Sequence, residues 1–82
     1  MKILNTPIEV IAHFGINEYP VPIRFRVAET VVKISSVISA YRANTAGVAA
    51  YLFDCMGEVN AVECRFTLKY VIERCKWYIY KK

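Results

Sequence analysis

The chain has 82 residues, a formal net charge of +4 and 56% apolar residues when tyrosine is counted. This length predicts one small domain, residues 1–82, with a limited core. No apolar run approaches the about 18 residues of a membrane-spanning helix, and polar residues interrupt the start where a secretion signal would be apolar. We therefore expect a soluble, cytoplasmic domain with no membrane partner, and the apolar surplus favours burial against a second subunit.

Two strands are predicted near the N-terminus. From Ile8 to Phe14, apolar residues alternate with Glu9 and His13, as in a strand with one buried face. From Ile23 to Val27, apolar residues alternate with arginines in the same way. Pro20 and Pro22 flank the start of this second strand, and the loop between the two strands is marked by Gly15, Asn17 and Pro20.

The middle of the chain fits either helix or strand. Val31 to Tyr41 has apolar residues at helical spacing, but its density of valine, isoleucine and serine favours a long strand. Arg42 to Gly47 is predicted to be a polar loop. Ala46 to Met56 also fits a short helix ended by Gly57. We predict a strand instead, because this segment pairs well with the strand that follows it.

The next segment has the cleanest alternation in the chain. Apolar residues from Val62 to Tyr70 fall on one face, and charged residues and Thr67 fall on the other. With a turn at Val59 and Asn60, each core-face residue of one strand meets a core-face residue of the next. The predicted pairs are Cys55 with Cys64, Phe53 with Phe66, Tyr51 with Leu68, and Asp54 with Arg65. A slip by two residues would set Asp54 against Glu63, a repulsive pair.

A final hairpin is predicted to turn at Arg74 and Cys75. The predicted pairs are Glu73 with Lys76, Ile72 with Trp77, and Tyr70 with Ile79. Trp77 and Ile79 then join the core, while Tyr78 and Tyr80 point outward towards Val71 and Lys69. The whole pattern predicts an all-β fold: a six-stranded antiparallel meander that forms a small barrel or a strongly bent sheet.

The three cysteines are an odd number without paired spacing. This favours reduced thiols that act as small core residues over a disulfide framework. A Cys3His zinc site is a weaker hypothesis, since nothing in the sequence clusters the ligands. A redox switch between Cys55 and Cys64 is likewise weaker, and it depends on their facing each other across the hairpin.

No catalytic arrangement is visible. His13 is the single histidine and lies on the polar side of a strand, and no spacing marks a serine as nucleophile or selects a carboxylate pair. The glycines are too far apart for a phosphate-binding loop. We expect no enzyme activity and no cofactor.

The outer face of the sheet is the candidate binding surface. Its residues are Arg24, Arg26, Leu52, Arg65, Lys69, Val71, Tyr78 and Tyr80. Tyrosine and arginine beside apolar residues favour an interface with a second copy or another protein. A plain solvated surface is the second interpretation. A nucleic-acid-binding face, on which bases stack on tyrosines and phosphates meet cations, is the third.

The segment Pro22-Ile23-Arg24-Phe25-Arg26, followed by Phe66-Thr67-Leu68-Lys69-Tyr70 and Trp77-Tyr78, resembles a family of small uncharacterised bacterial proteins. Their pattern is P-x-R-F-R, a variable middle, F-x-L-x-Y and a closing W-Y strand, and it covers about three quarters of the chain. The resemblance implies a compact β fold in a bacterial cytoplasm. It assigns no role to any residue.

Overall fold

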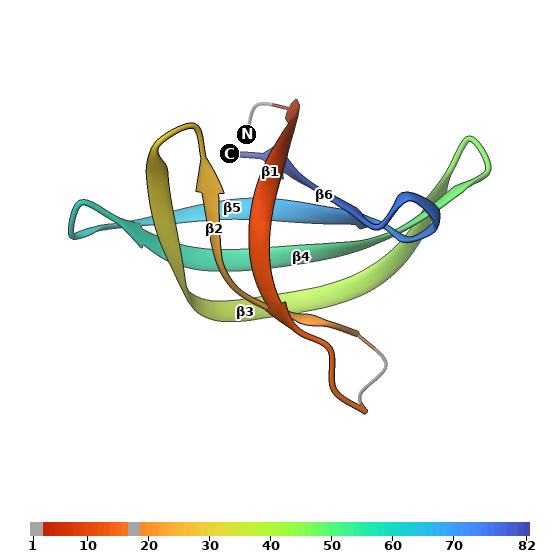
Figure 1. The fold of residues 1–82 in the computed structure, drawn as a ribbon, viewed down its shortest axis with the longest axis horizontal. Helices are drawn as coiled ribbons and strands as arrows, with labels where there is room; N and C mark the ends of the chain where they lie inside the picture. Colours follow the sequence, from red (N-terminus) through yellow and green to blue (C-terminus); the bar gives the residue numbers. More distant parts are fainter. Residues whose placement is uncertain (1–2, 17–18) are drawn as a thin grey trace.

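The computed structural model describes residues 3–16 and 19–82, which form six β-strands and no α-helix. The strands are β1 (Ile3–His13), β2 (Val21–Val27), β3 (Thr30–Thr45), β4 (Val48–Val59), β5 (Val62–Val71) and β6 (Lys76–Lys81). Each strand pairs antiparallel with its neighbours in sequence, and β6 also pairs with β1 (Figure 1). The predicted six-stranded meander is confirmed, and it closes into a small barrel.

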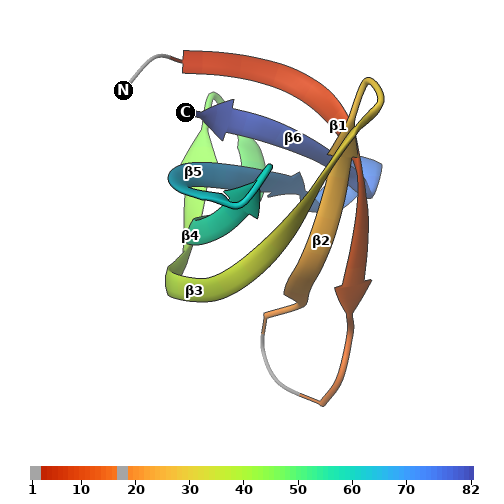
Figure 2. The same ribbon diagram turned by 90° about the vertical axis from the view of Figure 1, so that its left-hand side faces the viewer.

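Two bent strands make closure possible. The first half of β1, up to Ile8, pairs with β6, and its second half, from Glu9, pairs with β2. Figure 2 shows β1 passing over β6 and then bending down beside β2. β3 is shared in the same way, because Thr30 to Lys33 pair with β2 and Lys33 to Thr45 pair with β4. Two bulges in β3 supply its curvature.

Several strand boundaries differ from those predicted. β1 begins at Ile3 rather than Ile8, and Pro22 lies inside β2 next to a bulge, where a missing N–H is tolerated. Asn17, part of the predicted loop, lies outside the described residues. The predicted polar loop from Arg42 to Gly47 is wrong, because β3 continues to Thr45.

The loop prediction failed because the actual turn needs only two residues. Ala46 and Gly47 have φ values of 52° and 80°, so both adopt the left-handed conformation of a tight hairpin turn. Arg42 and Asn44 are exposed strand residues instead. Ala46 to Met56, which fitted either helix or strand, is mostly strand, since β4 begins at Val48.

The predicted register between β4 and β5 is wrong by two residues. Cys55 lies opposite Phe66, Asp54 lies opposite Thr67, and Phe53 lies opposite Leu68. The turn is at Asn60 and Ala61, with φ values of 50° and 63°, rather than at Val59 and Asn60. A β-branched valine resists positive φ, whereas asparagine accepts it readily.

This register changes the pairing of charges and thiols. Glu58 and Glu63 lie opposite each other, and Lys33 of β3 faces Glu58 from the other side. Cys64 lies opposite Gly57 rather than Cys55, and all three cysteines are free. The predicted direct Cys55–Cys64 pair, on which the redox hypothesis depended, is therefore wrong.

The predicted register of the last hairpin is also wrong by two residues. Lys76 lies opposite Val71, Trp77 opposite Tyr70, Tyr78 opposite Lys69, and Ile79 opposite Leu68. The connection is longer than expected, because Ile72–Arg74 form a 3-10 turn and Cys75 follows with a φ of 54°. A four-residue connection moves every pair relative to a two-residue one.

Both slips are by an even number of residues, so each side chain keeps its predicted face. The centre of the barrel is filled as expected by Phe53, Cys55, Phe66, Leu68, Tyr70, Trp77 and Ile79, together with Phe25 and Val32. Phe53, Cys55 and Leu68 are fully buried.

Gly57 allows β3 and β5 to approach β4 closely. A Cβ at this position would lie 2.6 Å from Cε1 of Phe66 and 2.9 Å from the carbonyl oxygen of Lys33. The ring of Phe66 therefore occupies the space that a side chain at residue 57 would need.

Candidate functional site

The predicted surface residues occupy two separate parts of the barrel exterior. Arg24 and Arg26 lie on β2, which is opposite β5 in the closed ring of six strands. The remaining residues lie on β4, β5 and β6; they are Leu52, Arg65, Lys69, Val71, Tyr78 and Tyr80. The structure thus brings five of the eight around one hollow, whereas Arg65 lies outside its lining and the two arginines of β2 are on a separate strand.

A hollow of ≈ 340 Å³ lies among this second group. Its described lining residues are Asn5, Ala43, Val48, Ala50, Leu52, Lys69, Val71, Arg74, Tyr78 and Tyr80, and we call it the basic–aromatic hollow. Leu52 and Val71 are only 7% and 4% exposed, so they form its apolar bottom rather than a projecting patch. Ala43 lies opposite Ala50, and these two small side chains leave the space.

The rim of the basic–aromatic hollow carries cations placed against aromatic rings. Lys69 Nζ lies 5.3 Å from the ring centroid of Tyr78 and 4.9 Å from that of Tyr80. Lys81 Nζ lies 5.5 Å from the Tyr80 ring. These distances are within the about 6 Å range of cation–π attraction, which holds both rings in place.

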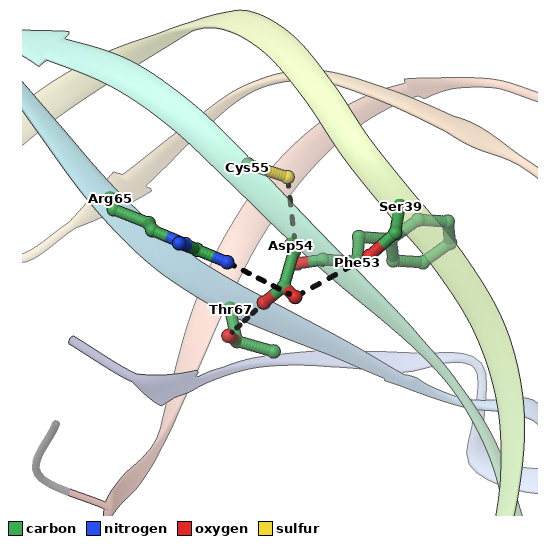
Figure 3. Close-up of polar contacts among 6 residues, drawn as sticks. All are labelled: Ser39, Phe53, Asp54, Cys55, Arg65 and Thr67. Carbon is green, nitrogen blue, oxygen red and sulfur yellow. Dashed lines mark hydrogen bonds and ion pairs between the residues drawn. The ribbon is translucent and has the colours of Figure 1, made fainter.

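Asp54 is held by structural contacts on the same side of the sheet. Figure 3 shows Ser39, Thr67 and Arg65 converging on its carboxylate. Thr67 Oγ1 donates to Asp54 Oδ1 at 2.7 Å, and Ser39 Oγ donates to Oδ2 at 3.4 Å. Arg65 is a diagonal neighbour rather than the predicted direct partner, and its Nη2 still lies 3.7 Å from Oδ2. Arg65 is therefore partly occupied by this ion pair.

The two arginines of β2 belong to an apolar surface. We give the name β1–β3 surface to five of the exposed apolar side chains of the first three strands, namely Ile11, Ile23, Val31, Ile38 and Tyr41. Ile11, Arg24, Arg26 and Val31 line a hollow of ≈ 480 Å³ together with Glu9. Arg26 forms an ion pair with Glu9, and Arg24 lies opposite Lys33.

Aromatic rings cluster at one end of the barrel. The ring centroids of Tyr19 and Tyr51 are 4.9 Å apart, and those of Phe14 and Tyr70 are 5.8 Å apart. The pKa of Tyr70 is raised by a hydrogen bond with the Cys75 side chain and by burial. Its hydroxyl is therefore harder to ionise than that of an ordinary tyrosine.

The buried thiol of Cys55 has low reactivity at neutral pH. Burial, with a smaller effect of the Asp54 charge, raises its pKa to about 12. The reactive thiolate form is therefore scarce at neutral pH. For this residue the predicted role of a reduced core thiol is confirmed.

The sequence prediction missed Arg74, Ala43 and Ala50 as parts of the basic–aromatic hollow. Ala43 had been placed in a loop, so nothing in the predicted strands set it beside Ala50. It also missed Ile38 and Tyr41 as exposed strand residues, since it treated the tyrosine as part of a possible helical stripe. A correct end for β3 would have placed Ala43 beside Ala50, whereas Ile38 lies at a bulge between Val37 and Ser39 that no sequence signal marks.

Comparisons with known proteins found no matching family model, no matching curated protein and no matching solved structure. The resemblance to small bacterial proteins stays a prediction. Among residues 3–16 and 19–82, no three histidine, cysteine or acidic side chains are grouped so that they could hold a metal ion. The same residues contain no helix of the length and apolarity needed to cross a membrane.

Proposed function

We propose that this protein is a non-enzymatic binding domain of the cytoplasm that works by self-association through its β1–β3 surface. The observation that supports the proposal most is the distribution of apolar residues between the two halves of the barrel. Within the described residues, ten of the eleven large apolar side chains that are exposed lie between Ile3 and Tyr41. Val62 is the exception.

The buried residues have the opposite distribution. Of the twelve buried apolar side chains other than proline in the described chain, two come from β1–β3, namely Phe25 and Val32, and Pro22 of β2 is buried as well. The first three strands therefore supply few fully buried residues. Residues such as Ile8, Val10 and Val37 pack against the core while only partly buried, and other apolar side chains of these strands are exposed. Exposed apolar patches typically mark interaction sites, and Ile11 and Val31 of this half line one hollow together.

An unpaired strand edge runs through the same surface. β2 pairs with β3 only as far as Lys33, and in the described part of the chain no other strand takes its place along the rest of β3. In Figure 1, β3 continues along the lower side of the barrel after β2 has left it. A strand edge with free N–H and C=O groups accepts another strand by main-chain hydrogen bonding.

The composition of this edge favours a second copy as the partner. Between Ile34 and Thr45, Arg42 is the single charged residue, and there is no proline. Two antiparallel copies of this segment repel only if the two Arg42 side chains face each other. A symmetric pair also buries Ile38 and Tyr41 twice, as expected for the self-complementary interface of a two-fold dimer.

The test is the mass of the protein in solution, measured by size-exclusion chromatography with light scattering over a range of concentrations. We expect a dimer that dissociates on dilution. Ile38→Lys should shift the protein to monomer, since a lysine at a strand edge opposes pairing.

Val62→Lys is the matched control. Val62 is 66% exposed and Ile38 is 53% exposed, so both changes place a charge on an already accessible strand residue. The control should keep the mass of the wild type. A wild-type protein that is monomeric at the highest attainable concentration would overturn the proposal, and so would equal effects of the two variants.

A further inference from the structure

We propose that the basic–aromatic hollow binds single-stranded nucleic acid, with a base in the hollow and phosphates on its rim. This second binding function goes beyond self-association. Most of the lining of the hollow lies on β4–β6, and Asn5 of β1 and Ala43 of β3 complete it. The chemical feature that the site would recognise is a flat aromatic base linked to a phosphate.

The bottom of the hollow suits the flat face of a base. Leu52 and Val71 present buried aliphatic groups, and the small side chains of Ala43 and Ala50 leave a depression above them. The volume of ≈ 340 Å³ lies within the about 300–1,000 Å³ of typical small-molecule sites. Bases stack on such surfaces without regard to sequence, because every base has an apolar face.

The two tyrosines supply stacking platforms at a useful spacing. Tyr78 and Tyr80 are half-buried, line the same hollow and are two residues apart on β6. Alternate residues of a strand are about 6.6 Å apart, roughly twice the ~3.4 Å rise per nucleotide of one strand in duplex DNA. A nucleic-acid strand that is stretched and unpaired thus places successive bases on successive rings.

The cations lie where the phosphates of such a strand would pass. Lys69 sits between the two rings, Lys81 lies beside Tyr80, and Arg74 is on the rim. The described lining of the hollow contains no acidic residue. Asp54, on the same side of the sheet, is bound by Thr67, Ser39 and Arg65, which reduces its repulsion of an anion.

The test is fluorescence anisotropy of a labelled single-stranded oligonucleotide titrated with the full chain at several salt concentrations. We expect binding whose affinity falls as salt rises, because each phosphate contact releases counterions. Unlabelled single strands should compete better than a duplex of the same sequence, whose bases are not free to stack.

Variants separate stacking from charge. Tyr80→Leu keeps an apolar side chain but removes the ring, and we expect affinity to fall roughly tenfold. Tyr80→Phe keeps the ring and should bind like the wild type, which controls for a general effect on folding. Lys69→Gln should weaken binding and lower the salt slope by about one charge.

Arg24→Gln removes the same charge from β2 and is the matched control for Lys69→Gln. The proposal is overturned if Arg24→Gln weakens binding as much as Lys69→Gln does, or if Tyr80→Leu binds like the wild type. It is overturned equally by absence of binding at low salt, or by inorganic polyphosphate competing as well as the oligonucleotide. A free mononucleotide that competes as strongly as the oligonucleotide would overturn the assignment to a polymer.

Discussion

The two halves of this barrel are built differently from similar amounts of apolar sequence. In β4–β6, apolar side chains on both faces are buried, including Leu52 and Val71 on the outer face. In β1–β3, Phe25 and Val32 are buried, while Ile11, Val31 and Ile38 are about half exposed or more. The C-terminal half therefore supplies most of the fully buried residues, and the N-terminal half closes the barrel and keeps more apolar surface exposed.

The difference teaches that apolar content alone does not locate the core of a small barrel. A strand contributes to the core in proportion to the neighbours that cover it, and β3 loses one neighbour after Lys33. Apolar residues of the same types are thus buried in β4–β6 and exposed to possible partners in β1–β3. Four paired comparisons test this contrast, each measured at a fixed protein concentration because association would add to stability.

The largest contrast is between two phenylalanines. Phe53 in β4 is fully buried, and Phe53→Ala should lower the free energy of unfolding by about 3–5 kcal/mol. Phe14, after β1, is 60% exposed and contacts the edge of Tyr70, so Phe14→Ala should cost only about 0.5–1.5 kcal/mol. Urea unfolding followed by tryptophan fluorescence measures both, and equal losses would contradict the division into two halves.

The next contrast is between two carboxylates. Asp54 accepts a hydrogen bond from a buried threonine, whereas Glu9 forms an exposed ion pair. Thr67 is 3% exposed and donates to Asp54, so Thr67→Val should cost about 1.5–3 kcal/mol by leaving a charged acceptor without its shortest bond. Glu9 and Arg26 form an ion pair with side chains that are 71% and 54% exposed. Glu9→Gln should cost no more than about 0.2–1 kcal/mol. Thermal or urea unfolding distinguishes the two, and the reverse order would be inconsistent with this structure.

Gly57 tests how tightly the C-terminal half is packed. Gly57→Ala forces the Phe66 ring to move and should cost about 1–3 kcal/mol. Gly47 has a positive φ but open space around it, so Gly47→Asn, which accepts this conformation, should change stability little. If both variants unfold at the wild-type urea concentration, the close approach at Gly57 is not a constraint.

The last test is a pH dependence that is absent at neutral pH and develops only in alkaline solution. The pKa of Cys55 in the folded state is about 12, above its ordinary value of 9.0, so the unfolded chain loses this proton first as pH rises. The stabilisation is complete below about pH 9 and should be lost between pH 9 and 12, by at most about 1.4 kcal/mol per pH unit.

Cys55→Ala should remove this part of the alkaline slope, whereas Cys75→Ala, at an exposed position, should retain it. The comparison is made from urea unfolding at several pH values. Identical slopes for the two variants would show that the burial of Cys55 has no energetic consequence for its ionisation.

Strand faces were predictable from sequence, and strand partners were not. Alternation assigned Phe53, Phe66 and Trp77 to the core because a side chain's face depends only on its own strand. Register depends on which residues form the turn, and the choice of Val59 over Ala61 moved every pair between β4 and β5 by two residues. The energetic argument from Asp54 and Arg65 failed because the arginine is long enough to reach diagonally.

The binding surfaces were predictable only in part for the same reason. The sequence identified Lys69, Tyr78 and Tyr80 as outward residues, and the structure places them on one hollow. The depth of that hollow comes from Ala43 opposite Ala50, a pairing that appears only when β3 is known to extend to Thr45. No local pattern marks two alanines from different strands as neighbours.

The pairing of Ile3 with Lys81 gives the barrel an unusual order of assembly. Every other strand pair joins neighbours along the chain, whereas this one brings together segments from opposite ends of the sequence. Because this pairing closes the longest loop of the barrel, its loop-closure entropy cost is the largest, and we expect it to form last. Until it forms, β1 and β6 each expose an edge that a second unfinished molecule can capture. Refolding at high protein concentration should therefore favour exchange of β6 between chains, and dilution should favour the closed monomeric barrel.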